Sequence, residues 1–256
     1  QFGSFTLTNS PWGHSSYHAF QLTVEHRLSK GLSLLLGYTH SKSIDDIGES
    51  GTSSSIQDNG CHRCERSIAA LDQPNVVRLS SLYQLPWGPQ RQFLNHGWLG
   101  NALGGWDLGG TYQYSSGQPL SLSSPQQSAS LSTAAAMRPT LTGAPVTTRV
   151  TNSAGQLSDF NPDAFKQTGT YAFGNAPRFM SALRNPALTN VDLSLQKKVQ
   201  IRESMAFTIR LEAINALNHV IFTGPDTAVA DTNFGYHTLT QKNTPRIAQI
   251  SGRFTF

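Results

Sequence analysis

The sequence predicts an all-β protein: a partial antiparallel transmembrane β-barrel of about seven strands with long external loops. First, several segments alternate apolar and polar side chains with a period of two, which suits a wall between lipid and a polar interior. Second, only 38% of the 256 residues are hydrophobic, and no apolar run approaches the ~18 residues of a membrane-spanning helix. Third, short and long connections alternate between these segments.

The first two strands are expected to form a hairpin. In the first, the even positions from Phe20 to Leu28 are mainly apolar and the odd positions are polar. Residues 29–31 (Ser-Lys-Gly) have the composition of a tight turn, and Leu32, Leu34 and Leu36 then alternate with more polar neighbours. The complete set of expected strands spans residues 17–29, 31–43, 75–86, 104–117, 188–199, 204–217 and 245–256.

The middle of the chain contains two short alternating segments, which follow a long polar stretch at residues 41–73 and precede a second one at residues 118–185. Val77, Leu79 and Tyr83 share one face of the third strand, and the fourth strand alternates in the same way. Between the fourth and fifth strands, residues 118–185 are dense in Ser, Ala, Thr, Gly and Pro. A stretch of this length without clear strands is usually a functional or mobile loop, so we expect one here.

The fifth and sixth strands are separated by a short turn, expected at residues 200–203. If this turn sets the register, Asp192 and Arg210 lie nearly opposite each other. Together with Glu212 and Arg253 they form a polar set that is expected to face the lumen.

The last strand has the clearest alternation. One face is apolar and aromatic, and the other is polar. The two faces consist of Ala248, Ile250, Gly252, Phe254 and Phe256 on one side and Gln249, Ser251, Arg253 and Thr255 on the other. A strand of a soluble sandwich with one solvated face would alternate as well, so this segment alone does not decide between the two classes.

The connections resolve that choice in favour of a barrel. Those after the first, third and fifth strands are short or moderate, and those after the second, fourth and sixth are long. Bacterial outer-membrane barrels have short periplasmic turns and long external loops, so a chain that ends in the periplasm would place every long loop outside. An odd number of strands does not fit a single-chain bacterial barrel. A small self-contained barrel would need an eighth strand within residues 118–185.

Six ordered motifs resemble a known family, the Oar-like TonB-dependent outer-membrane transporters, in the C-terminal part of their barrel. The motifs are SSYHAFQLTVEHRLSKGLSLLLGYTHSKSIDD (15–46), LDQPNVVRLSSLYQLPWG (71–88), LGGWDLGGTYQYSSGQPL (103–120), FGNAPRFMSALRNPALTNVDLSLQKK (173–198), FTIRLEAINALNH (207–219) and PRIAQISGRFTF (245–256). The resemblance implies that residues 1–256 are the C-terminal fragment of one outer-membrane barrel domain. In that family the barrel has about 22 strands and follows a plug and a carboxypeptidase-regulatory-like domain. The chain begins at Gln1, and we expect it to be the tail of a longer protein rather than one whose signal peptide was removed.

The resemblance also implies partners. These are outer-membrane lipid, TonB through a plug domain outside this sequence, an unknown extracellular ligand, and the barrel-assembly machinery. The family's terminal aromatic residue is read by that machinery, which assigns Phe254 and Phe256 to an assembly signal. The formal charge of +4 is mild and no run of Lys or Arg occurs, so nucleic acid is not an expected partner.

Cysteine and acidic residues are the remaining candidates for chemistry. Cys61 and Cys64 form a CxxC motif, but the sequence has no second cysteine pair for zinc and no thioredoxin-like context. We therefore expect a loop disulfide, since an exterior loop is oxidising. Acidic residues in the first long loop could bind a hard cation, but a solvated acidic loop is favoured because their spacing does not match an EF-hand. They are Asp45, Asp46, Glu49 and Asp58.

No nucleophile motif or phosphate-binding loop is present, so the sequence predicts no enzyme, no cofactor and no metal site. The expected function is to form the wall and external loops of a TonB-dependent receptor that takes up a scarce ligand. The alternative is a non-transporting adhesin or structural surface barrel whose Ser/Thr-rich loops bind a partner.

Overall fold

The structure, a computed structural model, describes residues 13–47, 56–58, 60–88, 91, 93–94, 96–125, 137–152, 155–169, 172–237 and 240–256. Its long strands are β1 (Ser15–Ser29), β2 (Leu32–Asp45), β4 (Asn75–Gln84), β5 (Trp106–Ser115), β10 (Leu188–Arg202), β11 (Met205–Ile214) and β12 (Ile247–Thr255). The short strands are β3 (Ser67–Ile68), β6 (Pro119–Leu120), β7 (Thr140–Leu141), β8 (Phe165–Lys166) and β9 (Met180–Arg184). The helical segments are η1 (His62–Glu65), α1 (Gly97–Leu103) and η2 (Pro162–Ala164).

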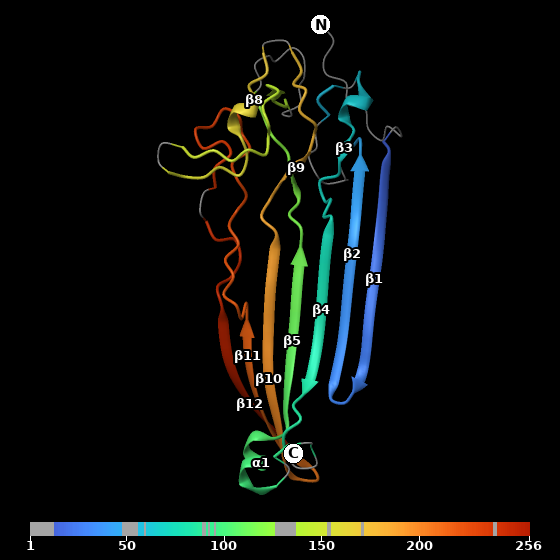
Figure 1. Cartoon of the computed structure of the whole chain (residues 1–256), viewed down its shortest axis with the longest axis vertical. Coiled ribbons are helices and arrows are strands. Elements are labelled where there is room, and N and C mark those ends of the chain that lie inside the picture. Colours follow the sequence, from blue (N-terminus) through green and yellow to red (C-terminus); the bar gives the residue numbers. More distant parts are fainter. Residues whose placement is uncertain are drawn as a thin grey trace.

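The long strands form one antiparallel sheet in the order β1-β2-β4-β5-β10-β11-β12, with β3 paired to the upper part of β2 (Figure 1). Each expected strand boundary lies within three residues of the observed one. The predicted all-β fold is therefore confirmed, because alternation is a local property that the chain keeps when it pairs with its neighbours. None of the helices among the described residues is long and apolar enough to span a membrane.

A two-residue turn joins β1 to β2. Lys30 and Gly31 both have positive φ, at 50° and 84°, as in a type I′ turn. This turn twists in the same sense as the flanking strands, and glycine adopts its second position without steric cost. Residues 29–31 are thus the tight turn that the composition predicted.

The register gives the sheet one apolar and one polar face. In one row across five strands, Val24, Leu36, Leu79, Tyr112 and Val191 lie side by side. The next row has Glu25, Leu35, Ser80, Thr111 and Asp192 on the opposite face. Apart from Leu35, this second row is polar.

The apolar face is exposed in the chain by itself. Phe20, Val24 and Leu28 on β1 are 60%, 42% and 57% exposed, and Ile250 on β12 is 78% exposed. A soluble monomer rarely leaves so continuous an apolar face in water, so this face needs a lipid or protein environment.

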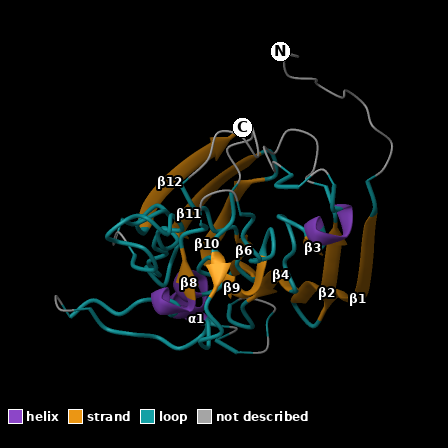
Figure 2. Cartoon of the chain, turned by 90° about the horizontal axis from the view of Figure 1, so that it is seen from above, coloured by secondary structure: helices purple, strands orange, loops and turns teal. Residues whose placement is uncertain are grey.

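Within the described residues the sheet does not close on itself. Its end strands β1 and β12 each have one long neighbour, and seen from above they lie far apart (Figure 2). The alternative of a small self-contained barrel finds no support, because the described part of residues 118–185 adds only short strands to the fold.

The three long connections meet at one end of the sheet, the end opposite α1 (Figure 1). We call this region the cap: the described residues of 46–74, 116–187 and 215–246. The cap has its own core around Phe160, which is fully buried and makes edge-to-face contacts with Phe165 and Phe234 at centroid distances of 5.8 and 5.2 Å. The prediction at 118–185 was a functional or mobile loop. Its described part packs into a small folded layer with the pairs β6–β9 and β7–β8, which differs from a mobile loop, and a functional role for it stays a prediction.

Candidate functional site

Buried ion pairs fasten the second long connection to the first. Among the described residues, three arginines between positions 138 and 184 pair with carboxylates between positions 45 and 72. The pairs are Arg138–Glu65 (2.7 Å), Arg178–Asp45 and Arg184–Asp72 (2.7 Å). Both partners are removed from water in the pairs of Arg138 and Arg178, whereas the Arg184 side chain keeps 22% of its surface exposed. Each pair favours one arrangement of the cap over the sheet.

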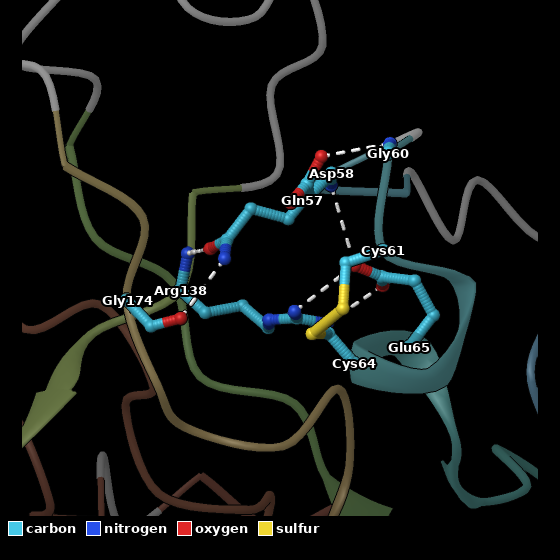
Figure 3. The surroundings of a disulfide bond; sticks show 8 residues. All are labelled: Gln57, Asp58, Gly60, Cys61, Cys64, Glu65, Arg138 and Gly174. Atoms are coloured by element: carbon cyan, nitrogen blue, oxygen red, sulfur yellow. Dashed lines mark hydrogen bonds and ion pairs between the residues drawn. A yellow bond between two sulfur atoms is a disulfide. The ribbon is translucent and has the colours of Figure 1, made fainter.

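A disulfide supports the most buried of these pairs (Figure 3). Cys61 and Cys64 are joined by a disulfide across η1, at whose end Glu65 has no exposed surface. The Glu65 carboxylate accepts two hydrogen bonds from the Arg138 guanidinium, at 2.7 and 3.0 Å. Gln57 completes the contact by accepting from the Arg138 backbone N–H and donating to the carbonyl of Gly174. We call the segment of Gln57, Asp58 and residues 60–65 the clip.

Two acidic residues at the start of the first long loop, Asp45 and Asp46, make structural contacts. Asp45 is buried against Arg178, and the Asp46 carboxylate accepts hydrogen bonds from the backbone N–H of His14 (2.6 Å) and faces its ring nitrogen (3.1 Å). Burial raises the pKa of Asp46, but the contacts from His14 outweigh it and the pKa lies below its ordinary value. A solvated acidic loop is therefore wrong for Asp45 and Asp46, because both residues are buried and their carboxylates are engaged by Arg178 and His14.

Asp58 accepts from the backbone N–H of Gly60, and Glu49 lies outside the described residues. In the described part of the chain, no three His, Cys, Asp or Glu side chains are grouped to hold a metal ion.

A polar hollow of about 450 Å³ opens in the cap beside the end of β9. Its lining includes the titratable residues Arg149, Asp159, Arg184 and His237, together with Phe160. His237 pairs with Asp159, and its Nδ1 lies 2.6 Å from the carbonyl of Thr223. The volume falls within the range of small-ligand sites, so the hollow can hold a small polar molecule.

The residues expected to face the lumen share the polar face of the sheet, but their pairing differs from the prediction. Arg210 lies opposite Gln196 rather than Asp192 and pairs with Glu212 on its own strand at 2.6 Å. Asp192 instead accepts from the backbone N–H of Asn215. The predicted Asp192–Arg210 pair was wrong because β10 continues to Arg202, which shifts the turn to residues 203–204 and moves the register by four. Arg253, the fourth of these residues, lies opposite Thr208.

The last strand has its aromatic residues at its tip. Phe254 lies opposite Phe207, whereas Phe256 follows the strand and is 92% exposed. The rings of Phe254 and Phe256 have centroids 6.3 Å apart. Phe256 contributes little to the packing of this sheet. A role in barrel assembly, before the fold is complete, therefore remains the prediction for this residue.

Replacing Phe256 with alanine in the full-length protein is expected to slow membrane insertion and lower its amount in the outer membrane. The stability of inserted protein should change by no more than about 1–2 kcal/mol, because the residue is exposed and outside the strand ladder. Quantitative immunoblots of outer membranes and thermal melting of the purified protein measure the two effects. Trp98→Ala is the matched control, since Trp98 in α1 is also strongly exposed at 76%. Equal outer-membrane levels of wild type and Phe256→Ala would leave Phe256 as an ordinary wall residue.

Sequence reasoning missed the arginine pairs of the cap. No local motif marks them, because their partners are 73 to 133 positions away. A weaker signal was present: acidic residues outnumber basic ones in residues 45–74, whereas basic residues outnumber acidic ones in residues 116–187. Two long loops of opposite charge that leave the same end of a sheet are expected to bind each other.

Comparison with known proteins gives one match. No curated protein and no solved structure matches this chain significantly. A family model described as "Outer membrane beta barrel domain" matches residues 1–249, nearly the full length of the sheet and cap described above. With its antiparallel sheet of one apolar and one polar face, the chain belongs to the outer membrane beta barrel domain family and resides in the outer membrane.

Proposed function

We propose that this chain forms part of the barrel wall and the cap of a TonB-dependent outer-membrane receptor that takes up a scarce ligand. The observation that carries the proposal is an open sheet with a charged inner face. Seven long strands in the described residues do not close, so the complete barrel needs more strands than these. Barrels with many strands enclose a wide lumen, and in 22-stranded outer-membrane transporters that lumen is filled by a plug.

The polar face supports a filled or wet lumen. Its charged groups on neighbouring strands include Arg78, Asp107, Asp192, Arg210 and Glu212. These charges avoid lipid only if they face water or another polar domain inside the barrel. The resemblance of the six motifs to Oar-like transporters implies that this polar domain is a plug, which is displaced when TonB acts on it.

The cap supports ligand capture. Its connections are held by buried ion pairs and its polar hollow is preformed, so a ligand meets an ordered surface at the barrel entrance. An ordered site loses less conformational entropy on binding than mobile loops do. This chain supplies capture and enclosure, and the energy for transport comes from TonB acting on the plug.

The test uses the full-length protein purified from outer membranes. In planar lipid bilayers it should give no steady current, and deletion of the plug domain should open a wide pore. The same protein should bind the purified C-terminal domain of TonB, and a variant without the plug should not.

The outcomes separate the classes of barrel. An open channel in the intact protein would identify a porin. A barrel that stays closed without any plug and ignores TonB would identify the adhesin or structural barrel. Either result would overturn the uptake function.

A further inference from the structure

Basic side chains gather above the apolar face of the β1–β2 hairpin, at the end nearest the cap. His18 and Lys42 lie opposite each other, two positions above the pair of Phe20 and His40. Because side chains alternate, these four residues share the face that carries Leu22 and the other apolar residues below. The apolar wall of this hairpin thus ends in a rim of basic residues, among which Lys42 carries a formal positive charge.

The clip and the adjoining Arg66 extend this rim. A hollow of about 420 Å³ is lined by Ser16 and Ile44 of the same face and by Arg63 and Arg66. Arg66 is extended and lies two residues before Ile68, the partner of Ile44, so it continues the same face of β3. Lys42, Arg63 and Arg66 are exposed, and no side-chain hydrogen bond or ion pair of theirs is seen among the described residues.

The other titratable groups that line this hollow have partners of their own. Asp46 lines it, but its carboxylate is engaged by His14. His62 also lines it and has its own interaction. Lys42, Arg63 and Arg66 bring three formal positive charges against the one carboxylate of Asp46, so the net charge of the rim and hollow is positive.

From this arrangement we infer that Lys42, Arg63 and Arg66 bind the phosphate groups of a lipid in the outer leaflet. An apolar wall capped by cations matches a molecule with acyl chains below and phosphates above. Arginine supplies planar, multiple donors for phosphate oxygens, and lysine adds a point charge. A free anion would contact the cations but not the adjoining apolar wall.

The site also couples lipid to the cap. Arg63 lies inside the clip, next to the disulfide, and Glu65 two residues later holds Arg138. A lipid phosphate on Arg63 and Arg66 therefore steadies the clip from outside while Arg138 holds it from inside. The inference rests on membership of the outer-membrane family and does not depend on TonB-driven uptake.

The test measures binding of bis-phosphorylated lipid A to the purified full-length protein in detergent micelles. The variant Lys42→Gln/Arg63→Gln/Arg66→Gln is expected to bind about 100-fold more weakly, since each cation near an anionic lipid surface contributes about fivefold. The matched control Lys30→Gln/Arg91→Gln/Arg202→Gln removes the same charge from exposed residues at the opposite end of the sheet and should bind as wild type does.

Two further arms identify the ligand chemistry. Lipid A without its phosphates should bind as weakly as the triple variant does, and an excess of inorganic phosphate should displace little lipid. Unchanged binding by the triple variant, or equal binding of dephosphorylated lipid, would overturn the inference. Full displacement by inorganic phosphate would do so too, because it would reveal a site for free anions.

Folding of each variant is checked by its heat-modifiable mobility on gels. If the triple variant does not fold, Arg63→Gln and Arg66→Gln alone should each lower affinity about fivefold. Wild-type affinity in both single variants would then contradict the site.

Discussion

Exchange of Glu65 for glutamine is expected to destabilise the cap by about 3–5 kcal/mol while the sheet below it keeps its stability. The side chains of Glu65 and Arg138 are 0% and 7% exposed, so the exchange leaves a buried cation without its counter-ion. Glutamine also turns an amide donor toward the donors of the guanidinium. Hydrogen exchange measured by mass spectrometry in the full-length protein gives the opening free energy for cap peptides around β8 and β9, with β10 as the internal reference.

Two variants sharpen this result. Asp231→Asn removes an exposed carboxylate from the same cap and should change the opening free energy by less than about 0.5 kcal/mol. Glu65→Gln combined with Arg138→Met removes the stranded charge and should regain much of the loss. Unchanged exchange of the cap in Glu65→Gln would show that the clip does not hold it.

The barrel strands could be predicted from the sequence because their signal is local. Each strand shows alternating apolar and polar residues over about ten positions, and Gly31 marks the turn that joins β1 to β2. The polar face containing Asp192, Arg210 and Glu212 follows from the same alternation. Pairing is less local: a turn placed two residues too early moved the partner of Arg210 by four positions.

The cap could not be predicted in this way. Phe160, Phe165 and Phe234 meet in its core although no periodic pattern surrounds them, since the segments that carry them are mostly irregular. Glu65 and Arg138 are 73 positions apart, and no local sequence motif around either residue identifies the other as its partner. Burial there depends on which loops leave the same end of the sheet, and this becomes known only once the strand order is known.

An arginine placed on the apolar face is expected to have the second large effect. Leu79 lies in the middle of β4, about halfway between the cap end and the α1 end of that strand. Its neighbours on the adjacent strands are Leu36 and Tyr112. If that face meets lipid, Leu79→Arg places a charge near the midplane of the bilayer, at a cost of about 2–4 kcal/mol. Urea unfolding of the full-length protein in lipid vesicles should show a clearly lower midpoint than for wild type.

The adjacent residue supplies the control because it differs only in its face. Ser80 follows Leu79 on the same strand and shares the polar face with Thr111 and Asp192. Ser80→Arg adds the same side chain at the same depth but directs it toward water or a polar domain, near the carboxylate of Asp192, so its effect should stay within about 1 kcal/mol. The contrast between the two variants measures the environment of each face independently of arginine's effect on strand pairing. A larger loss for Ser80→Arg than for Leu79→Arg would mean that the faces are reversed, and the polar row would then need a different explanation from a lumen.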